Sequence, residues 1–211
     1  MTSTGPDGQR RRRARRGQGG ELRERIVDTA ATLLAESGDE QAVSIRSVAD
    51  AVGVTPPSLY LHFPDKSALL RAVVERLFSD LERDVARSQA GSGGPVERVL
   101  ALARAYLAFG LGSPGRYKVL YEGRVLPALD LPDGGVPGRA LIEAAAGDLQ
   151  EAVQGGQHLP AGDARATTIL LWQLLHGAVS LRINKPGFPW RDAWADVGPA
   201  VRTLVGVPGQ G

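Results

Sequence analysis

The stretch from Ser44 to Lys66 constrains the fold more than any other part of the chain. It reads SIRSVADAVGVTPPSLYLHFPDK. Apolar residues recur at helical spacing in its first half, which predicts a short amphipathic helix that begins after Ser44, a favourable N-cap residue. Gly53 follows where the chain has to turn, and glycine tolerates the positive φ angle that such a turn often requires. We therefore expect two short helices joined by a tight turn.

The second helix of this stretch has clear limits. Thr55 is expected to cap it, and Pro56 and Pro57 fall at its first two positions, where backbone N–H groups have no intrahelical partner. Pro64 ends it, and Asp65 is expected to cap a third helix. This layout is that of a helix-turn-helix, whose second helix enters the major groove of DNA.

Two cations in this stretch lie where a helix disfavours them. Arg46 and Lys66 each fall in the first turn of a helix, whose dipole repels positive charge. One interpretation is a pair of solvated surface charges with a small energetic cost. The other is a phosphate at the helix end, which attracts both the cation and the exposed N–H groups. Because the two cations flank one turn, we favour the phosphate interpretation.

These residues resemble the DNA-binding domain of the TetR family of transcriptional regulators. The resemblance covers Glu21 to Leu81 and is carried by the sequences SIRSVA, AVGVT, LYLHF and PDKSALL. Its most specific part is the run from Leu59 to Phe63, followed by Lys66. The family often has a lysine and a small residue where this chain has two prolines, so the family's base contacts do not transfer directly to this chain.

The resemblance implies an all-α fold and double-stranded operator DNA as a partner. An enzyme would need a nucleophile with a base, a phosphate-binding loop or paired carboxylates, and Ser58 and Ser180 have no evident partner. We therefore expect a protein that is not an enzyme. The candidate DNA-binding residues of the motif are Ser44, Arg46, Thr55, Pro56, Pro57, Ser58, Tyr60, His62 and Lys66.

The basic charge of the chain is concentrated at its N-terminus. Residues 1–16 hold six arginines and one aspartate, whereas the remainder holds 19 basic and 22 acidic residues. Residues 1–20 lack apolar periodicity, and we expect a disordered, Arg-rich arm. Such an arm can enter the minor groove beside a docked helix, with Arg13, Arg15 and Arg16 as candidate contacts. The alternative is a solubilising tail without a defined contact.

The composition of the chain argues against several other classes of protein. No apolar run approaches the roughly 18 residues of a membrane span, and no apolar region follows the basic N-terminus, which argues against a secretory signal. The chain has no cysteine, and no two of its three histidines fall at a metal-ligand spacing. We expect a cytoplasmic protein without a cofactor or metal.

The rest of the chain shows helical periodicity and no sustained strand alternation. We expect about nine helices: a three-helix DNA-binding domain over 21–81, and a helical bundle for regulation and dimerisation over 82–211. The helices expected in the second part, after a long connecting helix over 65–90, cover 96–110, 116–122, 139–153, 161–183 and 190–205, the last with a kink at Gly198–Pro199.

The helix expected over 161–183 is apolar nearly all round, which predicts burial on more than one side. Because a domain of this size can hardly cover it alone, we expect a subunit interface. Its segment WQLLHGAVSL resembles a regulatory-domain subclass of the TetR family with Trp, His and Gly at this spacing. That resemblance implies a homodimer through the last two long helices and an internal pocket for a small-molecule effector.

His176 is the only histidine on an expected core helix. It is either a core histidine satisfied by a neighbour or a polar anchor in a mostly apolar pocket. The expected function is a ligand-responsive repressor whose homodimer leaves a palindromic operator when a small molecule binds. A helical DNA-binding dimer without a ligand and a helical enzyme are the alternatives. The candidate ligand-binding residues are Tyr106, Phe109, Tyr117, Tyr121, Trp172 and His176.

Overall fold

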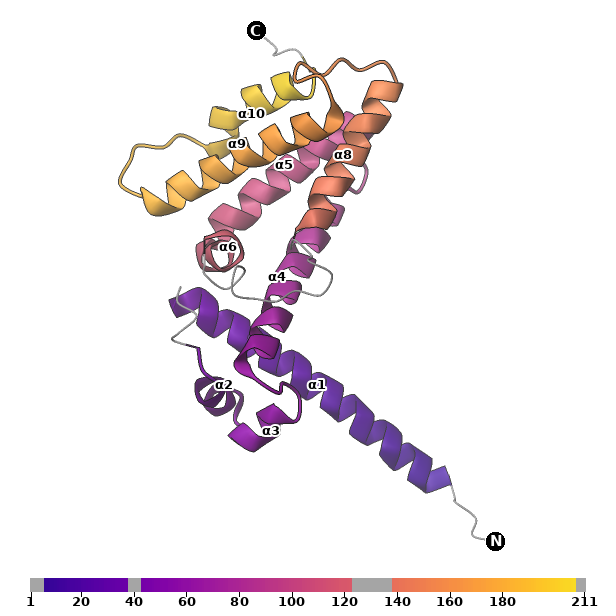
Figure 1. Ribbon diagram of the computed structural model, residues 1–211, viewed down its shortest axis with the longest axis vertical. Coiled ribbons are helices and arrows are strands. Elements are labelled where there is room, and N and C mark those ends of the chain that lie inside the picture. Colours follow the sequence, from indigo (N-terminus) through magenta and orange to yellow (C-terminus); the bar gives the residue numbers. More distant parts are fainter. Residues whose placement is uncertain (1–5, 38–42, 123–137, 208–211) are drawn as a thin grey trace.

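The computed structural model describes the backbone of residues 6–37, 43–122 and 138–207, and side chains from residue 20 onward. Nine helices account for nearly all of the described chain, which confirms the expectation of an all-α fold (Figure 1). Their bounds are α1 (Pro6–Ser37), α2 (Ile45–Val52), α3 (Pro56–Tyr60), α4 (Lys66–Gln89), α5 (Pro95–Gly112), α6 (Pro114–Tyr121), α8 (Arg139–Gln154), α9 (Ala164–Asn184) and α10 (Ala193–Leu204).

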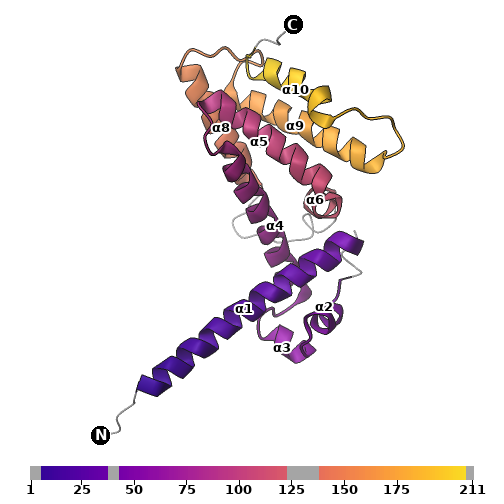
Figure 2. The same cartoon turned by 180° about the vertical axis from the view of Figure 1, so that it is seen from behind.

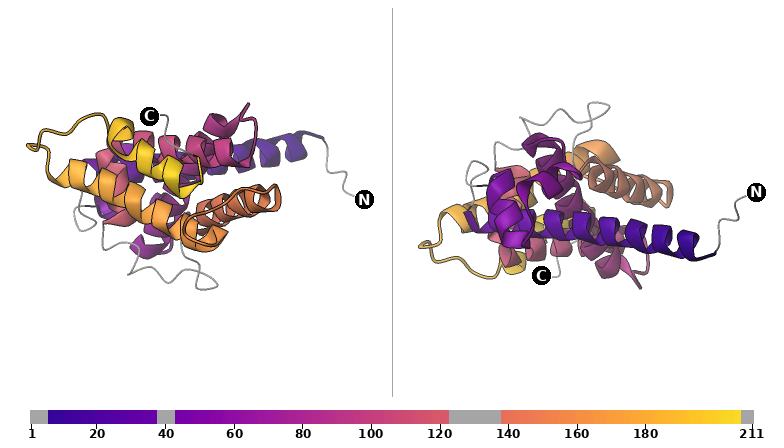
Figure 3. Two further views of the ribbon diagram at one scale, coloured as in Figure 1. Left: turned by 90° about the horizontal axis from the view of Figure 1, so that it is seen from above. Right: turned by 90° about the horizontal axis from the view of Figure 1, so that it is seen from below.

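The first helix is longer than expected from the sequence. α1 begins at Pro6 rather than near Glu21, and its N-terminal half projects beyond the rest of the molecule (Figures 1 and 3). The expectation of disorder rested on the lack of apolar residues, which bears on packing against other helices. Intrinsic helix propensity does not depend on such packing, and Arg, Ala and Gln are favourable helix residues. The side chains of Arg13, Arg15 and Arg16 lie outside the described residues.

α1, α2, α3 and the start of α4 form a small domain whose buried side chains belong to one core that continues into the rest of the molecule. Its buried side chains include Ile26 and Leu34 from α1, Val48 from α2 and Leu59 from α3, all no more than 1% exposed. Phe63, three residues after the end of α3, is also buried in this core. Burial of each such side chain contributes about 1.5–3 kcal/mol, so the apolar face that the sequence predicts for each short helix is what holds the motif on α1.

The remaining helices form a bundle around α5. This helix contacts α4, α8, α9 and α10 as well as α6. α4 runs from the small domain into the bundle and joins the two (Figures 1 and 2). The last helix begins at Ala193, later than expected, because Asp192 caps it by accepting a hydrogen bond from the Ala195 N–H at 2.9 Å. Pro199 lies inside α10, and the kink expected there stays a prediction.

A second contact joins the two parts of the molecule. α6 packs across α1, and at Gly115 the two backbones are so close that a β-carbon would overlap the carbonyl oxygen of Ala35. Arg76 of α4 adds ion pairs to Glu24 and Asp28 of α1, at 2.6 and 3.1 Å. The bundle therefore touches the DNA-binding domain through α6 as well as continuing from it through α4.

No helix among the described residues combines the length and apolar character that a bilayer crossing requires.

Candidate DNA-binding surface and ligand pocket

The turn of the helix-turn-helix motif, residues 44–66, is held by short-range hydrogen bonds. The Ser44 hydroxyl accepts from the Ser47 N–H at 3.0 Å, and the Ser47 hydroxyl accepts from the Ser44 N–H at 2.9 Å. This reciprocal capping box satisfies two N–H groups that the helix leaves without partners. Gly53 has a φ of 80° and donates to the Ala49 carbonyl. The expected cap and the expected glycine turn are both confirmed.

Thr55 occupies the N-cap position of α3, but its side chain makes no capping hydrogen bond. An N-cap side chain bonds the N–H of the second or third helical residue, and the second residue here is Pro57, which has none. The third N–H, of Ser58, donates instead to the Thr55 carbonyl at 2.9 Å. The Thr55 hydroxyl lies 3.0 Å from the Ser58 hydroxyl. The backbone prediction is confirmed, and the side-chain cap expected for Thr55 is absent.

The predicted DNA-binding side chains lie on the solvent side of the motif. Tyr60 is 53% exposed at the end of α3, and Arg46 is exposed on α2. Lys66 is the first residue of α4, where Asp65 caps the helix by accepting from the Ala68 N–H at 2.7 Å. The other candidates are exposed or half-buried: Ser44, Thr55, Pro56, Pro57, Ser58 and His62.

No role was predicted from the sequence for Leu61, which is 86% exposed beside Tyr60. An exposed leucine of this kind at the end of the recognition helix offers an apolar surface, and thymine methyl groups in the major groove take apolar contacts. The sequence signal that could have pointed to Leu61 is its position in the LYLHF run, which carries the resemblance to the TetR family.

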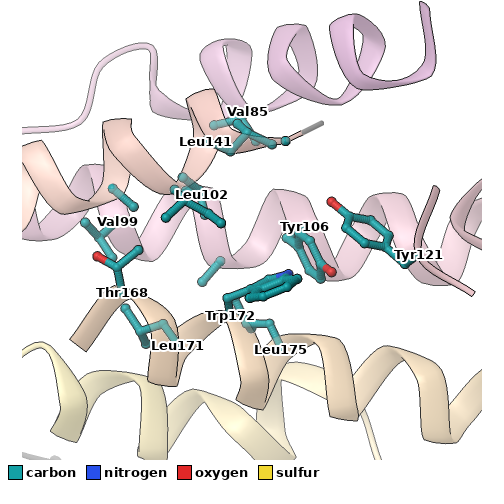
Figure 4. Close-up of a pocket in the computed structure, with 14 residues that line it drawn as sticks. Val85, Val99, Leu102, Tyr106, Tyr121, Leu141, Thr168, Leu171, Trp172 and Leu175 are labelled. Atoms are coloured by element: carbon teal, nitrogen blue, oxygen red, sulfur yellow. The ribbon is translucent and has the colours of Figure 1, made fainter. Parts of the chain in front are cut away.

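A cavity lies in the bundle between α4, α5, α8 and α9, and the end of α6 adds one wall residue (Figure 4). Its volume is about 70 Å³. Three of the six candidate ligand-binding residues line it, namely Tyr106, Tyr121 and Trp172. The other side chains of the wall were not predicted, since nothing in a sequence separates an aliphatic residue beside a cavity from one in solid core. They are Val85, Val99, Leu102, Ala103, Leu141, Ile142, Ala145, Thr168, Leu171 and Leu175, with Gly138 beside them.

The other three candidates do not line this cavity. Phe109 follows Tyr106 by three residues on α5 but lines a polar groove between α4 and α5. Tyr117 is fully buried on α6, behind the tyrosines of the wall. The Nδ1 atom of His176 lies 2.6 Å from the Tyr117 hydroxyl. His176 is half-buried and has a neighbour as its partner, which agrees with the first of the two interpretations given above except that the residue is not fully in the core.

Five side chains form an aromatic cluster at one end of the cavity: Tyr106, Tyr117, Tyr121, Trp172 and His176. The Tyr106 and Tyr117 hydroxyls lie 3.3 Å apart, and Tyr117 reaches His176 on α9. Burial raises the pKa of all three tyrosines well above the ordinary value, so the phenols stay neutral. The cluster therefore links α5, α6 and α9 through hydrogen bonds of neutral tyrosine hydroxyls.

The described residues offer no grouping of three or more His, Asp and Glu side chains that could hold a metal ion.

Comparisons with known proteins agree with this architecture. Residues 26–73 match the model for bacterial regulatory proteins of the tetR family, and residues 99–205 match the tetracyclin repressor-like C-terminal domain. The subclass with Trp, His and Gly at the observed spacing stays a prediction.

Individual relatives extend these matches. The chain is 30% identical to an uncharacterized HTH-type transcriptional regulator of Mycobacterium tuberculosis over 163 residues, which are 77% of this chain and 70% of that protein. It is 37% identical to the transcriptional repressor KstR of the same species over 79 residues, 37% of this chain and 36% of KstR. Among solved structures, AibR in complex with isovaleryl coenzyme A and operator DNA has a similar fold, with a TM-score of 0.63 and 19% identity over 88% of this chain and 99% of AibR. The chain therefore belongs to the TetR family, whose members are DNA-binding transcriptional regulators and not enzymes.

Proposed function

We propose that this regulator is a homodimeric repressor that binds a palindromic operator and releases it when a small molecule enters the cavity. The observation that carries the proposal is that one helix takes part in both sites. α4 begins at Lys66 in the motif, buries Leu69 in the core of the protein, and reaches the cavity at Val85. A displacement of α4 at the cavity therefore changes the position of the motif relative to the bundle.

Two relatives support this proposal. KstR is named a transcriptional repressor, and AibR was solved with both a coenzyme A thioester and operator DNA bound. The fold that this chain shares with AibR thus accommodates an effector and an operator in one protein.

The release of DNA has a definite energetic requirement. Two motifs in a symmetric dimer have to match major grooves about 34 Å apart, or a multiple of this distance. A ligand shifts the equilibrium between two motif spacings only by its differential affinity for them. A 100-fold loss of operator affinity requires about 2.7 kcal/mol of such a difference. By reciprocity, operator DNA weakens ligand binding by the same factor.

The surface of α9 and α10 supports the proposed dimer interface. On α9, Leu170 is 42% exposed and Leu181 is 52% exposed. On α10, small or apolar residues including Ala195 and Pro199 are also exposed. Because apolar side chains of this size gain free energy on burial, we assign the homodimer contact to these two helices.

A DNA-binding dimer without an effector is the second candidate, and the size of the cavity favours it. Ligand pockets commonly measure about 300–1,000 Å³, whereas this cavity measures about 70 Å³. An effector must therefore be small or must displace the walls. The second candidate predicts that no small molecule raises the melting temperature of the protein.

The test of DNA binding is a selection from a random library of duplex DNA with the purified full-length protein. We expect enrichment of an inverted repeat whose half-site centres are one helical turn or a multiple apart. Lys66→Ala should bind the selected sites and mismatched sites more weakly by a similar factor, because phosphate contacts position the protein without specifying sequence. Enrichment of a single, non-repeated site would contradict the dimeric mode of binding.

A further inference from the structure

The proposed function leaves the class of the effector open. Resting on that function, we propose that the effector is a small, uncharged molecule with a mostly apolar body, and that carboxylates, acyl-coenzyme A thioesters and organic cations are rejected. Three features of the cavity support this inference: the chemistry of its walls, the pairing of its polar groups and its size.

The part of the wall that the structure describes contains no charged side chain. All fourteen residues that line the cavity within the described chain are aliphatic, aromatic, Gly or Thr. A carboxylate moved into such a site would lose its hydration without gaining a cation, which is costly. A cation would meet the same penalty, because no carboxylate is among the described lining residues either. Aromatic faces attract cations, but three tyrosine and tryptophan rings without an anion only partly offset that loss.

The arginines of α5 near the cavity are engaged elsewhere. Arg98 precedes the wall residue Val99, yet its guanidinium bonds Asp148 and Glu151 of α8, at 2.7 and 2.5 Å. Arg104 stacks on the ring of Trp194, 3.8 Å from its centroid. Neither guanidinium is directed to the cavity, so an anionic ligand finds no partner on this helix.

Two hydroxyls of the cavity wall already have hydrogen-bond partners outside it. The Tyr106 hydroxyl lies at the centre of the polar end, next to Tyr121 and Trp172 (Figure 4). Burial raises the pKa of Tyr106, whose hydroxyl lies 3.3 Å from the Tyr117 hydroxyl behind the wall. At the opposite end, the Thr168 hydroxyl donates to the Ala164 carbonyl at 2.8 Å. An apolar ligand therefore leaves the hydroxyls of Tyr106 and Thr168 with the partners they already have. One hydroxyl or carbonyl of the ligand can join the tyrosine end.

The size of the cavity indicates the same class of effector. A cavity of about 70 Å³ cannot contain a coenzyme A group. Trp172 both lines the cavity and is 38% exposed, so its indole separates the cavity from solvent. After a modest movement of the Trp172 indole, the cavity can accept a ligand built on a small ring or a short chain.

The experiment compares probes that share one ring and differ in charge. Cyclohexanol, cyclohexanecarboxylate and cyclohexylammonium are titrated against the full-length protein by calorimetry, together with hexanoyl-coenzyme A. We expect cyclohexanol to bind at least about tenfold more tightly than any charged probe, which corresponds to about 1.4 kcal/mol. Equal or tighter binding of any charged probe overturns the proposal, and so does the absence of cyclohexanol binding up to millimolar concentration.

A pair of neighbouring alanines on α8 provides the matched variants. Ala145 lines the cavity and is 4% exposed, whereas Ala144 is exposed. Ala145→Leu should fill the cavity and abolish cyclohexanol binding, and Ala144→Leu should retain it. Melting curves and operator binding of both variants verify that each is folded. If Ala145→Leu is folded and binds cyclohexanol as the parent does, the probe sits elsewhere and the proposal is wrong. The duplex-library selection is carried out without any probe, so failure of DNA binding and failure of this ligand class are distinguishable.

Discussion

The DNA-binding motif and the aromatic cluster are built from contacts of very different range. In the motif, Ser44 bonds Ser47 and Asp65 bonds Ala68, each three residues away. In the cluster, Tyr117 on α6 meets His176 on α9, 59 residues later. A motif held by neighbours in sequence keeps its shape when the bundle around it shifts. A ligand in the cavity therefore acts on the position of the motif, and the connections through α4 and α6 carry that action.

The largest effect is expected at the contact between α6 and α1. Gly115→Ala places a β-carbon against the carbonyl of Ala35, and a backbone neighbour cannot rotate away. Overpacking typically costs about 1–3 kcal/mol and occasionally more, and we expect a loss of unfolding free energy at the top of that range. Urea denaturation followed by circular dichroism measures it.

Gly112→Ala is the matched control for this substitution. Gly112 lies three residues earlier, at the end of α5, and no atom comes within 4 Å of the position that its β-carbon would take. We expect unchanged or slightly higher stability for this variant. Equal stability of the two variants would show that α6 and α1 are not in tight contact, and α4 would then be the only connection between the two regions.

The contrast in contact range also explains what the sequence could predict. The cap at Ser44 and the turn at Gly53 follow from residues next to one another, and the structure has them where expected. The end of α3 is a correction: the helix stops at Tyr60, four residues before the Pro64 that was expected to end it. The cavity needs five helices in their final packing. Of the two candidates on α5, Tyr106 lines the cavity and Phe109 does not, because the helix turns Phe109 toward a different groove.

The second prediction concerns the aromatic cluster. Tyr117→Phe removes the hydroxyl that lies 2.6 Å from His176 Nδ1 and 3.3 Å from the Tyr106 hydroxyl. Loss of a hydrogen bond in a buried site leaves its partners unsatisfied, and we expect a loss of about 1–2 kcal/mol in unfolding free energy. Operator affinity of the folded variant should stay within a few-fold of the parent in anisotropy titrations. A loss of operator binding without loss of stability would place Tyr117 in the DNA-binding function instead.

The smallest effect is expected at the cap of α2. Ser44→Ala removes one hydroxyl from an exposed capping box, and we expect a loss of about 1 kcal/mol in unfolding free energy. Ser44→Gly should lose only a few tenths of about 1 kcal/mol, because glycine is tolerated at an N-cap.

The double variant Ser44→Ala, Tyr117→Phe tests whether the DNA-binding motif and the aromatic cluster contribute independently to stability. Substitutions in sites without shared partners add to within about 0.3–0.5 kcal/mol, and these two residues share none among the hydrogen bonds of the motif and the cluster. We expect additive losses in urea denaturation. A deviation of about 1 kcal/mol or more, on the order of the measured coupling between residues in contact, would mean that the motif and the cluster are already coupled in the ligand-free protein. The local contacts of the motif would then not be enough to hold it, and the ligand would act on its shape as well as on its position.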